Sequence, residues 1–111
     1  MLAAVHRLRA SAEFTETVRR GRRAGRPLLS VHLLVTAQAA PPRAGLVVSK
    51  GVGGSVVRHR VSRQLRHLLR DRVAALPPGS RLVVRAAPGA AQASSHDLAL
   101  DLDAALERVT R

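Results

Sequence analysis

A run of arginines at helical spacing is the part of this sequence best suited to binding a charged partner. Residues 58 to 70 read RHRVSRQLRHLLR and contain no acidic residue. Successive residues of a helix lie about 100° apart, so apolar side chains fall on one face and basic side chains on the other. Guanidinium groups match phosphate geometry with paired hydrogen bonds, which predicts a polyanionic partner. The apolar face holds Val57, Val61, Leu65, Leu68 and Leu69, and the basic face holds His59, Arg60, Arg63, Arg66, His67 and Arg70.

A solvent-exposed helix face could also carry these charges without any partner. Such faces usually mix both signs, because acidic and basic residues four apart stabilise a helix. Here the pairs Arg63–Arg66 and Arg66–Arg70 place like charges three and four residues apart, which costs stability. Bound phosphate would offset that repulsion, so contact with nucleic acid is the favoured interpretation.

A glycine-rich turn, VGGS at residues 52–55, precedes this helix. Helix N-termini with free amides bind anions, and glycine lets a backbone approach a ligand closely. The phosphate-binding pattern GxxxxGK[ST] is absent, and a plain strand-to-helix turn would look the same. The turn therefore supports anion binding only together with the arginine helix.

Residue patterns that support catalysis are missing. The five histidines show neither HxxxH nor HExxH spacing, and there is no GxSxG motif. No Asp or Glu occurs from residue 17 to residue 70, although two-metal phosphodiester cleavage needs carboxylates beside the phosphate. Asp101 and Asp103 lie two apart near the C-terminus and are expected to be solvated helix residues. The sequence predicts no catalytic residue and no metal site in this chain.

Composition narrows the class of protein. The 111 residues suit one domain spanning residues 1–111, and the net charge is +12. Lys50 is the one lysine, and no cysteine is present. No apolar run is long enough for a membrane span or a signal peptide, so we expect a cytoplasmic location. A membrane-surface helix would carry Trp, Phe and Lys beside its apolar face, and the basic helix has none, so we expect no membrane partner.

Six elements are expected in the order α-β-β-α-β-α. They form an α+β fold in which helices pack on a small mixed sheet. The two first strands are expected to pair as a hairpin, and residues 19–26 to form a basic connector. Phe14, the one aromatic residue, shares a helix face with Val18, and packing on the sheet is favoured over base stacking. The first expected helix is capped by Ser11 and ends near Arg20, and strands are expected at 28–36, 43–49 and 80–86. The basic helix is expected to end near Ala75. A final helix is expected to be capped by Ser94 or Ser95 and to bury Leu98, Leu102, Ala105 and Val109.

Four segments, in order, resemble the bacterial ribonuclease P protein component along nearly the whole chain. The most specific is AGLVVSKGVGGSVVRHRVSRQLRHLLR, which is similar to a strand followed by SKxxGxAxxRNRxKRxxR. The others are RLRASAEFTETVRRGRRAGRP, PPGSRLVVRA and SSHDLALDLDAALERV. The resemblance implies a left-handed βαβ crossover and the small subunit of a ribonucleoprotein that removes the 5′ leader of precursor tRNA. It also implies that the RNA subunit does the chemistry with Mg²⁺, which RNA and substrate mainly hold, and that the partners are this catalytic RNA and precursor tRNA, with no obligate protein partner.

The same resemblance assigns roles to residues. Arg58, His59, Arg60, Arg63, Arg66 and Arg70 are expected to contact the catalytic RNA, with Ser49 and Lys50 at the edge of a leader-binding cleft. Phe14 matches the aromatic residue of that cleft. Val18 stands where a second aromatic often sits, and Val31 or His32 stands near a strand position that is often aromatic.

Four positions depart from the family's signature. His59 replaces its central asparagine, Ser62 a usual lysine, Gln64 a usual Arg or Lys, and Gly54 a common asparagine. An imidazole donates and accepts one hydrogen bond and lacks the pattern of an amide, so support of cleavage is expected to be reduced or the RNA partner to be adapted. The competing interpretation is a basic RNA- or DNA-binding module of ribosomal or nucleoid type without a role in cleavage.

Overall fold

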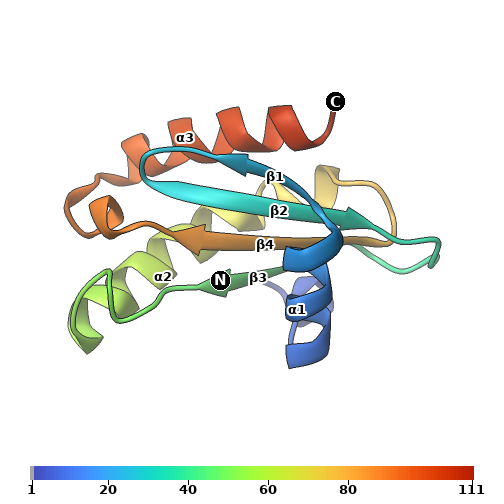
Figure 1. Ribbon diagram of the computed structural model, residues 1–111, viewed down its shortest axis with the longest axis horizontal. Coiled ribbons are helices and arrows are strands. Elements are labelled where there is room, and N and C mark those ends of the chain that lie inside the picture. The colour runs from blue at the N-terminus through green and yellow to red at the C-terminus, as the bar shows by residue number, and fades with distance from the viewer. Residues whose placement is uncertain (1) are drawn as a thin grey trace.

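Four strands form one mixed sheet in the computed structural model, which describes residues 2–111 (Figure 1). Their spatial order is β1 (Arg22–Gly25), β2 (Leu29–Val35), β4 (Ser80–Ala86) and β3 (Arg43–Val47). β2 is antiparallel to β1 and to β4, whereas β3 and β4 are parallel. The predicted α+β class and single mixed sheet are confirmed.

Three helices cover the two faces of this sheet. α1 (Ser11–Arg20) packs on β2 and β4 on one face. α2 (Ser55–Arg70) joins β3 to β4 as the predicted βαβ crossover, and it packs on the other face beside α3 (Ser95–Val109) (Figure 1). Short 3₁₀ turns lie at Ala4–His6, Val73–Ala75 and Pro88–Gln92.

The predicted hairpin between the first two expected strands, which are β2 and β3 in the structure, is wrong. β4 lies between β2 and β3, so these two strands do not touch. The turn before β4 is tied to the loop after β2, because Gly79 donates to the Ala40 carbonyl at 2.7 Å and its own carbonyl accepts from the Thr36 amide at 3.0 Å. Gly79 has φ +81°, and a Cβ there would lie 2.5 Å from the Thr36 carbonyl oxygen, so the turn requires glycine.

Other expectations about the elements need smaller corrections. The basic connector contains the short strand β1, in which Ala24 alone is buried. α2 ends at Arg70, and the 3₁₀ turn Val73–Ala75 follows before the prolines. Ser94 caps α3 as predicted, accepting from the Asp97 amide at 3.0 Å, whereas Ser11 is the first helical residue of α1 and not its cap.

The core lies between the sheet and the pair α2 and α3. The predicted apolar stripes of both helices are buried there against Val31, Leu82 and Val84 of the sheet. The N-terminal segment covers the open edge of β3, because the Leu8 amide donates to the Ala44 carbonyl at 2.9 Å. The buried helix residues are Val61, Leu65 and Leu69 in α2 and Leu98, Leu102, Ala105 and Val109 in α3.

Asp101 of α3 is not the solvated residue that the sequence suggests, whereas Asp103 is exposed as expected but pairs with an arginine. Asp101 is 9% exposed and accepts from the Leu28 amide at 2.9 Å and from Arg26 Nε at 3.3 Å. Asp103 is more exposed, and Arg72 donates to it at 2.6 Å, which lowers the pKa of the carboxyl group. Both carboxylates therefore fasten α3 to the rest of the fold.

Candidate nucleic-acid interface

The helix α2 has the two faces that its sequence predicts. Val61, Leu65 and Leu69 are fully buried, while the basic residues on the opposite side are exposed. We call this exposed set, His59, Arg60, Arg63, Arg66, His67 and Arg70, the arginine face.

The arginine face is nearly free of neutralising carboxylates. Within residues 2–111, its one acidic partner is Asp71, which lies 3.7 Å from Arg70 in an exposed pair. Arg60 donates to the Ala91 carbonyl, a contact that holds the side chain without cancelling its charge. Like charges therefore stay together on an open surface, which is the arrangement expected of a phosphate-binding helix.

The remaining signature residues flank this face. Arg58 is half-buried, and its Nε has no hydrogen-bond partner among the described residues. Gln64 turns toward α3, where its Nε2 donates to Ser95 Oγ at 3.1 Å. Ser62 is also half-buried. The departures at Ser62 and Gln64 therefore lie beside the exposed row, whereas His59 lies within it.

Ser49 and Lys50 lie just before the glycine-rich turn that leads into α2. Both are exposed, and the Ser49 carbonyl accepts from the amide of buried Val52 at 3.0 Å. Gly54 stands at the N-cap without a capping side chain. At Gly53 a Cβ would come 2.9 Å from the Val57 side chain, so the turn packs closely against the helix.

A groove runs between α1 and the sheet on the face opposite to α2. It has a volume of about 300 Å³ and an apolar floor of Phe14, Val18 and Val47, with Arg19 and Arg85 at its rim. Phe14 is half-buried because its ring lies over Gly45 of β3, where an added Cβ would meet the ring Cζ at 2.2 Å. The ring thus both packs on the sheet and lines the groove.

The strand register decides which residues reach this face. Gly45 pairs with Val83, Val83 pairs with His32, and His32 pairs with Arg23, so these four share the face that carries α1. Val31 points the other way, is fully buried in the core and does not line the groove, so its placement in the cleft is wrong.

His32 lies in this row as a buried residue. It is 4% exposed, and neither ring nitrogen has a hydrogen-bond partner in the described structure. Burial lowers the pKa of His32, and the positive charges of Arg23 and Arg85 lower it further.

Sequence reasoning missed the arginines around this groove. The strand β4 alternates, with Leu82 and Val84 in the core and Arg81 and Arg85 on the face of α1. That period of two was visible in the sequence, but it did not show which of the two arginines is exposed and unpaired. Arg81 is 8% exposed and paired with carboxylates, whereas Arg85 is exposed.

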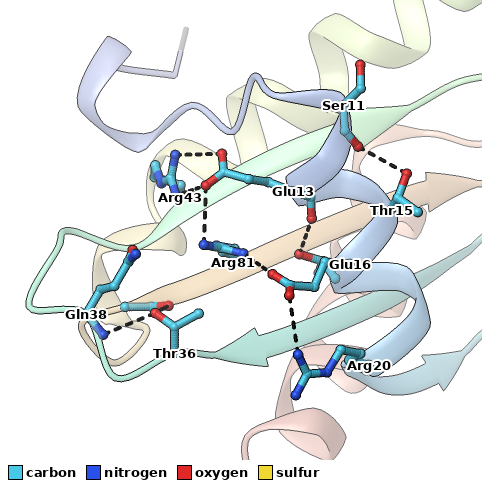
Figure 2. Close-up of polar contacts among 11 residues, drawn as sticks. Ser11, Glu13, Thr15, Glu16, Arg20, Thr36, Gln38, Arg43 and Arg81 are labelled. Atoms are coloured by element: carbon cyan, nitrogen blue, oxygen red, sulfur yellow. Dashed lines mark hydrogen bonds and ion pairs between the residues drawn. The ribbon is translucent and has the colours of Figure 1, made fainter.

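An ion-pair network fastens α1 to the sheet (Figure 2). Both Glu13 oxygens accept from Arg43, at 3.0 and 2.8 Å, and Arg81 lies 3.3 Å from the same carboxylate. Arg81 also donates to Glu16 at 2.5 Å, and Glu16 pairs with Arg20 at 3.3 Å. The bond from Arg43 lowers the pKa of Glu13 most, and the charges of Arg43 and Arg81 add to it. Both acids of α1 are thus held by arginines.

Two other kinds of site are absent from the described part of the chain. Residues 2–111 hold no group of three or more His, Cys, Asp or Glu side chains placed to bind a metal ion. None of the helices in that range is both long and apolar enough to cross a membrane.

Comparison with known proteins identifies the protein family. The family model described as Ribonuclease P matches residues 2–110. A "Ribonuclease P protein component" of Streptomyces avermitilis is 61% identical over 117 residues, covering 98% of this chain and 95% of that protein. The corresponding protein of Thermobifida fusca is 52% identical, covering 100% of this chain and 80% of its own length.

Solved structures show the same fold at low sequence identity. An RNase P protein of Staphylococcus aureus superposes with a TM-score of 0.81 at 20% identity, over 92% of this chain and 93% of the other. The RNase P protein of Thermotoga maritima gives a TM-score of 0.79 at 20% identity, over 93% and 96% of the two chains.

Proposed function

This chain belongs to the ribonuclease P protein family, and from that premise we propose how its two surfaces serve the enzyme. The arginine face of α2 docks on the catalytic RNA subunit, and the groove beneath α1 holds the 5′ leader of precursor tRNA. The observation that carries this proposal is the groove itself, which combines an aromatic floor with a basic rim. Aromatic faces stack on unpaired bases and arginines hold the backbone, which is how proteins bind single-stranded nucleic acid.

The two surfaces suit different forms of RNA. The arginine face is exposed along a helix of 16 residues, so it fits the phosphates of folded RNA. The groove offers the Phe14 ring for stacking, so it fits an unpaired strand. A leader beside a docked catalytic RNA would place the tRNA cleavage point between these two surfaces.

We assign the bond-breaking chemistry to the RNA subunit. The carboxylates of α1 are bound by arginines, and the described part of the groove is lined by no acid. Mg²⁺ prefers oxygen ligands in octahedral geometry, and the groove offers it none of the carboxylates it would need. The residues present do not fit a protein-held Mg²⁺, so the RNA and the substrate are the proposed holders of the metal.

Reconstitution tests the proposal. The protein is mixed with its cognate catalytic RNA and a precursor tRNA at low Mg²⁺ concentration, and leader removal is measured with and without protein. We expect the protein to increase the cleavage rate. We also expect the protein to strengthen the binding of precursor tRNA with a leader more than the binding of mature tRNA. No enhancement would favour the alternative, a basic ribosomal or nucleoid-type binding module.

Replacing His59 by asparagine gives a second test, which concerns the arginine face. His59 is exposed between Arg58 and Arg60 on α2, and within residues 2–111 its side chain makes no hydrogen bond or ion pair that requires an imidazole. The variant His59→Asn restores the amide that the family's signature carries. We expect it to fold normally and to change affinity for the catalytic RNA, whereas affinity for a free single-stranded leader stays the same.

A further inference from the structure

A second hollow adjoins the groove on the other side of Phe14. It has a volume of about 210 Å³, and the N-terminal segment, α1, β3 and α2 all contribute to its wall. Its basic residues are Arg7, Arg9 and Arg66, and its apolar wall includes Leu8 and Leu46. No carboxylate lines it along the described chain.

We propose that this hollow is an additional nucleotide subsite, which takes one unpaired nucleotide of the substrate's leader and connects the groove to the arginine face. The proposal rests on the proposed function, since it extends the path of the same strand. Two observations carry it: the continuity of the hollow with both surfaces, and its charge.

Continuity comes from shared residues. Phe14 lines both the groove and the hollow, so its ring forms the partition between them. Arg66 lines the hollow and also belongs to the arginine face. A strand that leaves the groove over Phe14 therefore enters the hollow and meets α2 without crossing an acidic surface.

Size and charge fit one nucleotide. Pockets that enclose a drug-sized molecule measure roughly 300–1,000 Å³, and this hollow is smaller, which suits one base. Glu13, which precedes Phe14 in the chain, is already paired with Arg43 and Arg81. Three guanidinium groups around an apolar wall thus leave a net positive site for a base and its phosphate.

Arg9 is the residue to change. It is exposed, and no hydrogen bond or ion pair of its side chain is found in the described structure. Arg7 is less suitable because its Nε donates to the Leu2 carbonyl at 3.1 Å and so supports the N-terminal segment. The matched control is Arg108, which is also exposed but lies on α3, on the far face of the sheet.

The first experiment compares Arg9→Gln with Arg108→Gln in the reconstituted enzyme, using precursor tRNAs whose leaders lengthen one nucleotide at a time. Arg9→Gln should weaken substrate binding roughly two- to fivefold, the value of one exposed ion pair, once the leader is long enough to reach the hollow. The log–log salt slope should fall by about 0.7, as for one single-strand phosphate contact. Binding of mature tRNA should stay unchanged, and Arg108→Gln should behave like the wild type.

Two results would overturn the subsite. Equal effects of the two variants would show a response to net charge alone. A loss with Arg9→Gln that is independent of leader length would assign the hollow to the catalytic RNA.

A second experiment does not depend on ribonuclease P activity. The chain contains no cysteine, so a single thiol can be placed at the exposed residue Ala10, beside the hollow, or at exposed Leu100 on α3 as the control. Each thiol is coupled to a photocrosslinker and irradiated with a single-stranded oligonucleotide. Stronger crosslinking at Ala10→Cys than at Leu100→Cys supports the subsite even where cleavage is not enhanced, and equal crosslinking contradicts it.

Discussion

Replacing Gly45 by alanine should weaken leader binding in the groove while leaving the fold intact. The new Cβ would lie 2.2 Å from Cζ and 2.5 Å from Cε2 of Phe14, whereas ordinary contact begins at 3.4 Å. The ring must therefore withdraw by about 1.2 Å or rotate outward. Phe14 is half-exposed and its Cζ is the free end of the side chain, so the ring can move without disturbing the backbone.

The expected magnitudes separate binding from stability. Alanine in a strand is favoured over glycine by about 0.5–1 kcal/mol, which offsets part of the packing that the displaced ring loses. The unfolding free energy should therefore change by no more than about 1 kcal/mol. Stacking of one base on an aromatic ring is worth about 1–3 kcal/mol, so affinity for a single-stranded leader should fall roughly fivefold or more.

A double-mutant cycle tests whether the effect acts through the ring. Affinity for a short single-stranded oligonucleotide is measured for Gly45→Ala, for Phe14→Ala and for the double variant. Because the clash requires the ring, Gly45→Ala should have no further effect once Phe14 is alanine. Additive losses, or wild-type affinity in Gly45→Ala, would refute the placement of Phe14 over Gly45 as the basis of the groove.

Three further predictions concern the docking face and the ion pairs. Replacing Arg60 and Arg63 together by alanine should flatten the log–log salt slope of catalytic-RNA binding by roughly one to two units, and an unchanged slope in salt titrations would place the RNA elsewhere. Asp101→Ala should lower the unfolding free energy by about 1–3 kcal/mol in urea, because it leaves the partly buried Leu28 amide without its acceptor. Glu13 has a lowered pKa in the folded protein, so its contribution to stability is present at neutral pH and is lost as the pH falls below the ordinary glutamate value of about 4.3. Glu13→Gln should therefore reduce the difference in melting temperature between neutral and acidic pH, and an unchanged difference would contradict the pairing with Arg43.

The sequence predicts the helices well because their signals are local. The apolar stripe of α2 repeats every three or four residues, and the stripe was enough to name its buried and exposed faces. The same holds for the cap of α3 at Ser94, which needs only the residues that follow it. The pairing of strands is different, since nothing in β2 or β3 shows that β4 will enter between them after the α2 crossover.

The groove could be predicted only in part for the same reason. Phe14 and Val18 lie four apart on one helix, so their common face follows from the sequence. The choice between Val31 and His32 depends on strand register, where a shift of one residue exchanges the two faces of a sheet. The contact between the Phe14 ring and Gly45 joins residues 31 positions apart in the chain, and no periodic pattern predicts such a contact.

The distribution of ion pairs explains how one small chain keeps two basic surfaces open. Six of its seven side-chain carboxylates lie within 4 Å of an arginine. Several of these pairs join α1 to the sheet and α3 to the rest of the fold, two link residues four apart in the chain, and a single exposed pair touches the arginine face. Arginines that pair within the fold thus hold the structure together, and the others stay free for phosphate. Reversing one buried partner, as in Arg81→Glu, should therefore harm folding, whereas the same change at exposed Arg85 should harm leader binding alone.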